Sequence, residues 1–279
     1  MSIQELLEIG VKRLKNKNIE EPIFISRLLM SFTIRKDRVF LVTNSEKELT
    51  KQQEKSFLES IEKVENHIPI QYITNNQEFM KMNFYVDENV LIPRQDTEVV
   101  AEEAINIIKN NNFKDILDMC TGSGILAVSI AKYIKNCNVS AVDVSQKAIE
   151  VAKKNAILNG VNDKIKFIHS NMFENVNGKF DVIISNPPYI KSKVINSLSE
   201  NVKKEPILAL DGGTDGLKFY KILANNAYQF LKPEGYLILE IGYDQKEEVT
   251  NLLMDNYQNI TCINDMGEND RVIICKKDR

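Results

Sequence analysis

A tetrapeptide, Asn-Pro-Pro-Tyr at 186–189, directly follows the run 180–185, which is apolar and β-branched enough to form a buried strand. Pro187 fixes its own φ angle and restricts Asn186 to extended backbone, so the side chain of Asn186 and the carbonyl group of Pro187 can be held at one place. Ligands bind at the carboxyl ends of strands in open parallel sheets. Two neighbouring oxygen acceptors complement one planar amino group. The motif therefore predicts a site for an amino group, and the alternative is a turn that only ends the strand.

A glycine-rich loop at 118–124 is the second candidate site, because it joins a predicted strand at 116–119 to a predicted helix that begins at Ile125. Its glycines let the backbone approach a ligand closely at the N-terminus of a helix. Asp143 follows the loop by nineteen residues, at the tip of the next predicted strand. A carboxylate there can accept hydrogen bonds from both hydroxyls of a ribose, so the loop and Asp143 predict the adenosine end of a nucleotide-like cofactor.

The glycine-rich loop leaves a second class of enzyme open. Gly122, Gly124 and Ala127 also satisfy the GxGxxA dinucleotide pattern, which is found in dehydrogenases. A dehydrogenase needs a proton-relay residue beside its substrate's carbonyl group, and none is evident in the sequence. The acceptors at 186–189 suit an amino group instead, so we favour S-adenosylmethionine as the cofactor.

The elements that would position both sites form an α/β fold. Strands and helices alternate from residue 115, which predicts a doubly wound, Rossmann-like sheet. The segment 205–216 is too long for a plain connection, so we expect an active-site lid there, with an inert surface loop as the alternative. The seven predicted strands lie at 116–119, 139–142, 165–168, 180–185, 235–241, 260–263 and 272–275, the last two as an antiparallel hairpin.

A helical region precedes this sheet. Ser2 and Glu5 fit a capping box, Pro22 suits the first turn of a second helix, and 50–64 has the spacing of an amphipathic helix. These signals predict a small helical domain over residues 1–70.

The period of the apolar residues then changes. A period of two at 70–73, 78–79 and 84–86 predicts extended backbone and a β-hairpin, so we expect a linker over residues 71–90. The catalytic domain would then occupy residues 91–279.

A charged segment opens the catalytic domain. Asp96 or Thr97 is the predicted cap of the apolar helix that follows. Arg94 has two interpretations: it reaches a ligand, or it pairs with Asp96 or Glu98.

The composition indicates a globular protein, with 279 residues of which 43% are apolar, a net charge of −3 and a pI of about 5.7. An acidic chain is poorly suited to hold nucleic acid through phosphates. No apolar run approaches a membrane span, and the N-terminus carries acid where a signal peptide carries base. We expect a cytoplasmic protein with no membrane partner and no stable nucleic-acid partner.

Cysteine and histidine placement predicts no metal site. His67 and His169 lie in separate segments and form no ligand pair. The cysteines show no CxxC spacing, which indicates reduced thiols and no disulfide framework. They are Cys120, Cys137, Cys262 and Cys275.

Together these motifs resemble the release-factor glutamine methyltransferases, the HemK/PrmC family, over almost the whole chain. The resemblance implies a helical substrate-binding domain before a seven-stranded class I methyltransferase domain. It also implies S-adenosyl-L-methionine as cofactor, peptide-chain release factors as protein substrates in translation termination, and N5-methylation of the glutamine in their Gly-Gly-Gln motif. Separately, we expect the protein to be a monomer. The matching stretches are 69–73, 78–79, 91–94, 96–98, 121–124, 186–189, 212–213, 215–217 and 240–242.

The resemblance also implies roles for single residues. Asn186 and Tyr189 would be the catalytic pair, and Asn186 would also touch the cofactor. Met172 would flank the adenine, although many relatives have an aromatic residue there. The glutamine amide would be held by Asn186, Pro187, Pro188 and Tyr189, and the cofactor by Cys120, Thr121, Gly122, Ser123, Gly124, Asp143 and Met172.

Three positions depart from the family pattern, because Cys120, Asn75 and Lys81 stand where glycine is usual. Asn tolerates left-handed backbone, whereas Lys81 does so poorly, so we expect the hairpin near Lys81 to turn differently from that of relatives.

Other substrates remain open. One is an exocyclic amine of adenine or guanine, which would meet the same acceptors after base flipping. Another is a glutamine of a ribosomal protein. A third interpretation is an interaction module that only binds a nucleotide.

Overall fold

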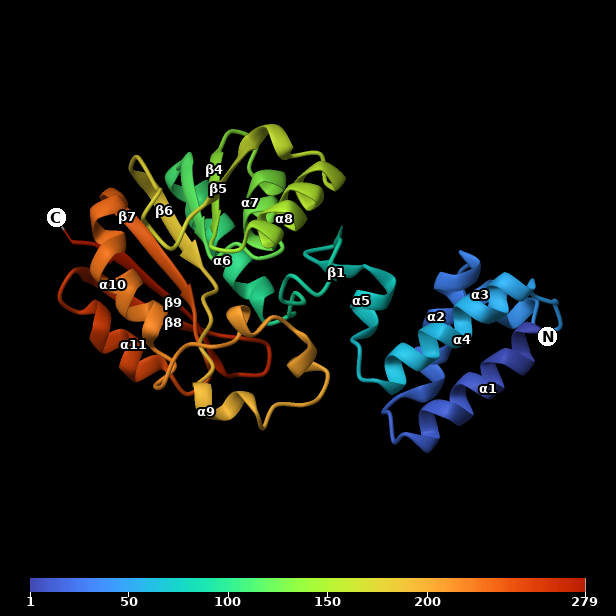
Figure 1. The fold of residues 1–279 in the computed structure, drawn as a ribbon. Helices are drawn as coiled ribbons and strands as arrows, with labels where there is room; N and C mark the ends of the chain where they lie inside the picture. The colour runs from blue at the N-terminus through green and yellow to red at the C-terminus, as the bar shows by residue number, and fades with distance from the viewer. Residues whose placement is uncertain (279) are drawn as a thin grey trace. The chain divides into compact units, whose positions relative to one another are not determined.

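The computed structural model describes residues 1–278 and has two compact units (Figure 1). The first comprises residues 1–75 and 199–204, and the second comprises residues 76–198 and the chain from 205 onward. Across residues 1–278, no helix is long and apolar enough to cross a membrane. Within the same range, no three His, Cys, Asp or Glu side chains gather where they could hold a metal ion. All four cysteines are free thiols.

The first unit is a helical bundle with its own core, as predicted. The Ser2 side chain accepts from the backbone N–H of Glu5, and the Glu5 carboxylate accepts from the backbone N–H of Ser2, which confirms the capping box. Pro22 lies in the first turn of the second helix, also as predicted. The helices are α1 (Ile3–Asn16), α2 (Pro22–Ile34), α3 (Arg38–Thr43), α4 (Lys51–Glu65) and α5 (Ile70–Thr74).

Residues 70–73 are helical in α5, so the predicted extended backbone there is wrong. Ile70 and Ile73 are three residues apart, which places them on one side of a helix, and Ile73 is buried. So short an apolar run fits both periods, and the period alone could not separate helix from strand. Asn75 ends the helix in the left-handed conformation, with φ 50°, which Asn tolerates.

The predicted β-hairpin is confirmed as β1 (Gln77–Phe79) and β2 (Met82–Phe84), which pair antiparallel. Its two-residue turn places Met80 at φ 49° and Lys81 at φ 59°, so Lys81 does adopt left-handed backbone. The turn is tied down at Met80: its N–H donates to Glu98 Oε1 at 2.6 Å, and its carbonyl accepts from the Tyr133 hydroxyl at 2.8 Å. These bonds help to hold a conformation that is unfavourable for two non-glycine residues.

The second unit contains the predicted seven-stranded sheet, in the order β5-β4-β3-β6-β7-β9-β8. The strands from β5 to β7 in this order are parallel, and β9 pairs antiparallel with β7 and β8. The strands are β3 (Asp115–Met119), β4 (Asn138–Asp143), β5 (Ile165–His169), β6 (Phe180–Ser185), β7 (Leu231–Glu240), β8 (Tyr257–Asn264) and β9 (Asp270–Lys277). The helices are α6 (Thr97–Asn111), α7 (Ile125–Tyr133), α8 (Gln146–Leu158), α9 (Ser192–Ile195), α10 (Lys218–Phe230) and α11 (Lys246–Leu253), with 3-10 turns η1 (Asn162–Lys164) and η3 (Ile207–Ala209); a further turn, η2 (Val202–Lys204), belongs to the first unit.

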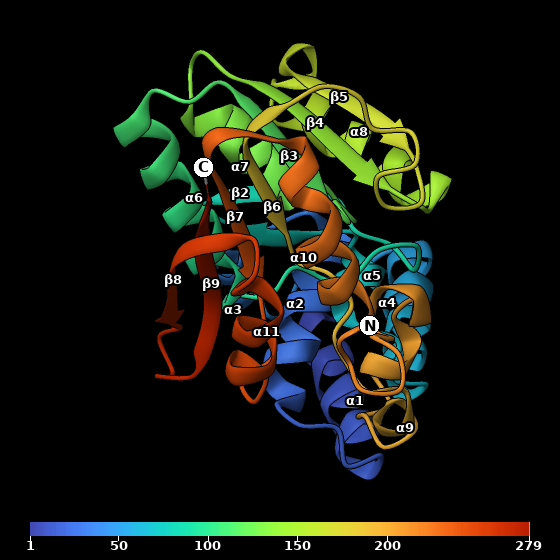
Figure 2. The same ribbon diagram turned by 90° about the vertical axis from the view of Figure 1, so that its left-hand side faces the viewer.

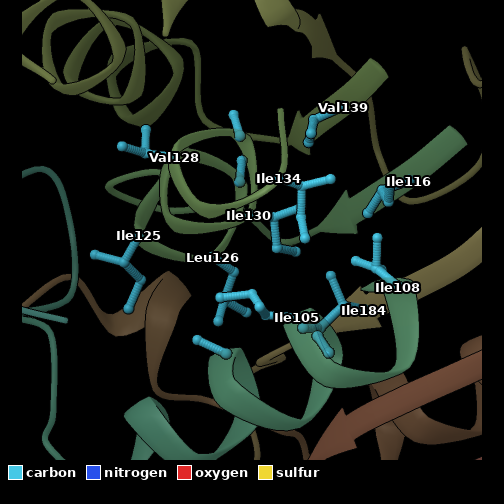
Figure 3. Packing of buried hydrophobic residues seen from close by; sticks show 14 of the residues in the cluster. Ile105, Ile108, Ile116, Ile125, Leu126, Val128, Ile130, Ile134, Val139 and Ile184 are labelled. Atoms are coloured by element: carbon cyan, nitrogen blue, oxygen red, sulfur yellow. The ribbon is translucent and has the colours of Figure 1, made fainter. Parts of the chain in front are cut away.

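Alternate residues of the central strands supply two separate cores. Ile116 and Ile184 belong to the core beside α6 and α7 (Figure 3), while their neighbours Leu117 and Ile183 belong to the core beside α10 and α11. In Figure 2 the face that α10 and α11 cover turns toward the viewer. Helices therefore cover both faces of the sheet, which confirms the predicted doubly wound arrangement.

Candidate active site

A pocket opens at the carboxyl ends of β3 and β6, the two strands between which the strand order reverses. Open α/β sheets bind their ligands at this point, because the connecting loops diverge there. The pocket lies within the second unit. It is lined by parts of the segments 89–97, 119–126, 142–148, 170–172, 186–188 and 206–209, and by Phe219.

The structure brings most of the predicted site residues to this pocket. Three of them are not among the lining residues: Gly124 is the first residue before α7, while Pro187 and Tyr189 follow the lining residues Asn186 and Pro188 in the chain. Those that line it are Cys120, Thr121, Gly122, Ser123, Asp143, Met172, Asn186 and Pro188.

The loop after β3 is held in an unusual backbone conformation. Cys120, Gly122 and Gly124 all have positive φ, at 63°, 54° and 82°. Gly122 lines the pocket, and a Cβ atom on it would meet nothing within 4 Å. A Cβ atom on Gly124 would lie 3.0 Å from that of Ala152, so this glycine also permits close packing on α8. The loop can therefore admit a ligand against its backbone.

Asp143, at the end of β4, ties this loop to the sheet. Its Oδ2 accepts from the backbone N–H of Gly122 and its Oδ1 from that of Ser145, each at 2.8 Å. Burial raises the pKa of Asp143, and the backbone donors act against that rise. Each oxygen keeps a lone pair for a further donor, so the carboxylate is suited to a pair of ribose hydroxyls.

Met172 and Cys120 form one wall of the pocket. Their sulfur atoms lie 3.9 Å apart, and Met172 is 7% exposed with φ 48°. Ser170 holds this bend, because its hydroxyl donates to the Met172 carbonyl at 2.9 Å and accepts from the N–H of Asn175 at 2.9 Å. Burial raises the pKa of the Cys120 thiol, so Cys120 is a packing residue and no nucleophile at neutral pH.

Asn186 presents its side chain to the pocket with a defined orientation. Its Nδ2 donates to Thr97 Oγ1 at 3.4 Å, and Thr97 is fully buried at the start of α6. The amide nitrogen is thereby directed to Thr97, which leaves Oδ1 available as the acceptor that the sequence predicts. The strand end is fixed as well, since the Ser185 hydroxyl donates to the Met119 carbonyl of β3 at 2.6 Å.

The backbone of Tyr189 is packed against the loop 212–216. A Cβ atom at Gly212 would lie 2.7 Å from Tyr189 Cα, and one at Gly216 would lie 2.6 Å from the Tyr189 carbonyl oxygen. The Nε2 of Gln245 bridges the Tyr189 and Gly216 carbonyl oxygens at 3.2 Å each. Burial raises the pKa of the Tyr189 hydroxyl, so this group stays protonated as a hydrogen-bond donor.

The predicted lid therefore divides into two parts with different contacts. Pro206 lines the pocket, as do Leu208 and Ala209 of η3. Residues 212–216 do not line it, and two of them, Gly212 and Gly216, pack on the backbone of Tyr189. A lid over the whole of 205–216 stays a prediction, and in its second half Gly212 and Gly216 are required for close packing on Tyr189.

The segment before α6 also differs from its prediction. Arg94 lines the pocket and pairs with Glu205, so the predicted pairing with Asp96 or Glu98 is wrong. Glu205 is buried, and its second oxygen accepts from the backbone N–H of Ile92 at 3.0 Å. This contact links two pocket-lining segments that are far apart in the sequence.

The start of α6 has no side-chain cap, although Asp96 or Thr97 was predicted to provide one. Asp96 is at the N-cap position with helical φ and ψ, and its side chain makes no capping bond. Its carboxylate lies 3.5 Å from the Arg271 guanidinium. The Thr97 hydroxyl oxygen accepts from Asn186 Nδ2. Tertiary partners have therefore replaced the local cap at both positions.

Several residues of the site gave no readable signal in the sequence. Gln245 stands in a polar segment, and Glu205 is one acid among many. Thr97 suggested a helix cap, which concealed its contact with Asn186. Glu240 stood out only as part of a motif, without a role. Each acts through a partner that lies far away in the sequence.

Comparison with known proteins agrees with this geometry. A profile described as Methyltransferase small domain matches residues 101–268, and one described as PrmC N-terminal domain matches residues 5–74. The chain is 39% identical over 279 residues to a "Release factor glutamine methyltransferase" of Clostridium acetobutylicum, covering 98% of both chains. It is 36% identical to the protein of the same name from Clostridium botulinum, covering 99% of this chain and 100% of the relative.

Solved structures support the fold. A methyltransferase from Pyrococcus furiosus superposes with a TM-score of 0.53 at 20% identity, covering 72% of this chain and 91% of that one. The hMettl16 catalytic domain superposes with a TM-score of 0.57 at 15% identity, covering 70% and 74%. At these identities the likeness concerns the fold alone. The match to the relatives over nearly the full length goes further: this chain belongs to the release factor glutamine methyltransferase family.

Proposed function

We propose that this protein transfers a methyl group from S-adenosyl-L-methionine to the side-chain nitrogen of the glutamine in the Gly-Gly-Gln motif of peptide-chain release factors. The observation that carries the proposal is one pocket with two different ends. Asp143 and the loop after β3 line one end, and the acceptor Oδ1 of Asn186 serves the other. The relatives' name supplies the substrate class.

The cofactor fits the residues that are present. The open space beside Gly122 accommodates a ligand against backbone, and the Asp143 carboxylate retains acceptor capacity for two hydroxyls. Met172, which also lines the pocket, would flank the adenine. When bound, S-adenosylmethionine supplies a methyl group on a positively charged sulfur. Asn186 would make only a secondary contact with it. The residues that would hold it are Cys120, Thr121, Gly122, Ser123, Gly124, Asp143 and Met172.

The chemical difficulty lies in the substrate, because the lone pair of an amide nitrogen is delocalised into its carbonyl group. Asn186 Oδ1 and the Pro187 carbonyl would accept the two N–H bonds, which orients the nitrogen toward the methyl group. The same acceptors stabilise the positive charge that grows on the nitrogen. No strong base is required, and the proton can leave to water after transfer. Pro188 and Tyr189 would shape the slot around the amide.

A whole protein substrate would be gripped at two places. The helical domain would bind the body of the release factor, while the pocket receives one glutamine side chain. We therefore expect a short Gly-Gly-Gln peptide to react with kcat/KM at least about tenfold below that of the intact factor. Equal values for peptide and factor, measured at saturating cofactor, would contradict recognition outside the pocket.

The setting proposed for this reaction is the cytoplasm, with the enzyme working as a monomer and without a stable nucleic-acid partner. The net charge of −3 supports the last point, since binding through phosphates favours a basic surface. Sedimentation of the protein alone and with release factor would test the monomer.

The function is tested by giving the enzyme labelled S-adenosylmethionine together with separate pools of cell protein and nucleic acid. Label in the protein pool, on release factors, is the expected result. Label on adenine or guanine would favour the base-methylating alternative, and label on a ribosomal protein would favour the other glutamine substrate.

A further inference from the structure

Glu240 is a buried carboxyl group behind the end of the pocket that contains Asn186. It ends β7, next to the end of β6, and is 1% exposed. The side chains of Thr97 and Tyr189 face its carboxyl group, and both lower its pKa as hydrogen-bond donors would. Its Oε2 has no hydrogen-bond partner within residues 1–278. A buried acceptor that is only partly satisfied costs stability, so its presence calls for a functional explanation.

Thr97 connects this carboxyl group to the pocket. A hydroxyl has one proton, and a carboxylate can only accept, so a Thr97 that donates to Glu240 can only accept from its next neighbour. That neighbour is Asn186 Nδ2, at 3.4 Å from Thr97 Oγ1. Asn186 must then direct its NH2 group to Thr97 and its oxygen to the pocket. The negative charge at Glu240 therefore sets the direction of each hydrogen bond in the series from Glu240 through Thr97 to Asn186.

The Glu240 carboxyl group also faces the side chain of Tyr189, which ends the same tetrapeptide. Other hydrogen bonds fix the backbone of both residues: Gln245 Nε2 donates to the Tyr189 carbonyl at 3.2 Å, and the Tyr220 hydroxyl donates to the Glu240 carbonyl at 2.9 Å. One carboxyl group thus contacts or orients the side chains at both ends of 186–189.

We propose that Glu240 is a positioning residue that fixes the direction of the hydrogen-bond chain through Thr97, so that Asn186 offers an acceptor to the substrate's amino group. This inference rests on the proposed function, since only an amino-group substrate needs an acceptor there. A neutral group at position 240 removes the preference for one direction of the hydrogen bonds through Thr97. An amide or a protonated carboxyl can donate to Thr97, which can then donate to Asn186 Oδ1 and turn the NH2 group toward the pocket.

The charge on Glu240 makes the hydrogen bonds through Thr97 sensitive to pH. Burial raises the pKa of Glu240 to about 7, while the hydrogen bond from Thr97 and the charge of Arg271 act against that rise. The charged form is present above this pKa and is lost as the pH falls through it. Methyl transfer should therefore slow on the acid side. The groups that face the carboxyl are Asp96 and Thr97 at the start of α6, Tyr189 after β6, Tyr220 of α10 and Arg271 of β9.

The test compares Glu240→Gln with Thr97→Val and the control Thr97→Ser, in single-turnover transfer to release factor at saturating S-adenosylmethionine. At pH 8 we expect Glu240→Gln and Thr97→Val each to slow transfer at least about tenfold, and Thr97→Ser to stay within about threefold. Cofactor affinity should change less than about twofold. The acid-side fall of the wild type should be absent from Glu240→Gln. The double variant Glu240→Gln with Thr97→Val should be no slower than either single variant, because both break one chain.

The inference is overturned if Glu240→Gln keeps the wild-type rate and pH profile, or if the losses of the two single variants multiply in the double variant. Should Glu240→Gln fail to fold, as seen by circular dichroism, equal rates for Thr97→Val and Thr97→Ser would overturn it. A wild type that leaves the release-factor glutamine unmethylated would refute the proposed function and this inference together, whereas an active wild type matched by Glu240→Gln refutes the inference alone.

Discussion

The two ends of the pocket are built from different kinds of contact. At the loop after β3, the backbone N–H of Gly122 meets Asp143, which is only 21 residues away. At the tetrapeptide after β6, Asn186 meets Thr97, which is 89 residues away, and Gln245 holds Tyr189 across 56 residues. The first end therefore depends on nearby backbone groups, and the second depends on side chains that only the folded chain brings together.

This difference suggests a division of labour. A site made of backbone groups and one carboxylate is suited to bind a cofactor that has a constant shape. A site whose acceptor is aimed by other side chains is suited to transition-state alignment, where small errors in direction are expensive. Substitutions at the loop after β3 and at Asp143 should then weaken cofactor binding. Substitutions at the tetrapeptide after β6 should slow methyl transfer.

The largest effect is expected for Asn186→Ala, which removes the aimed acceptor. Methyl transfer should slow by about a hundredfold or more, as when one preorganised group of an active site is deleted. Affinity for S-adenosylmethionine, measured by calorimetry, should change little. A turnover within a few-fold of the wild type would remove Asn186 from the alignment and erase the contrast between the two ends.

Next in size is Asp143→Ala, which tests the opposite end. Loss of charge-assisted hydrogen bonds should weaken S-adenosylmethionine binding by about tenfold or more. Transfer should recover when the cofactor is raised to saturation, unlike that of Asn186→Ala. Asp143→Asn is the matched control, because it keeps the shape and removes the charge. Unchanged affinity in a folded Asp143→Ala protein would refute the cofactor assignment.

Substitutions in the loop 212–216, which packs on Tyr189, should change the stability of the fold. Gly216 has φ 77°, and a Cβ atom there would lie 2.6 Å from the Tyr189 carbonyl oxygen. Gly216→Ala should therefore lower the free energy of unfolding by about 2 kcal/mol or more. Gly160→Ala is the control, since Gly160 has φ 69° with open space around it, and should cost about 1 kcal/mol. Equal losses in urea titrations would show that the packing on Tyr189 is loose.

The smallest effect concerns Cys120, which has a left-handed φ of 63° in the loop after β3. Cys120→Gly relieves this strain, whereas Cys120→Ala keeps it, and both remove the thiol. The glycine variant should be more stable than the alanine variant by about 1 kcal/mol. If thermal unfolding ranks the alanine variant higher, the loop is not strained at this residue.

The contrast between local contacts and contacts across long sequence distances also explains which features could be predicted from the sequence. The strands, the hairpin, the capping box and the loop after β3 follow from local patterns, so they could be predicted from spacing alone. The helix at 70–73 could not, because its few apolar residues fit both periods. Resemblance to a family supplied the role of the tetrapeptide, but not the residues that aim it.

The missed contacts share one physical reason. The roles of Thr97, Glu205, Glu240 and Gln245 depend on partners from other elements, and a single sequence contains no pattern that pairs them. The cap predicted at 96–97 failed in the same way, since tertiary partners won over the local hydrogen bond.

The most direct test of the central claim is mass spectrometry of a tryptic digest of release factor, after reaction with wild type and with Asn186→Ala in parallel. The account predicts that the glutamine of Gly-Gly-Gln gains a single methyl group with the wild type and remains almost unmodified with Asn186→Ala. An unmodified glutamine with the wild type, or equal modification by both proteins, would contradict it.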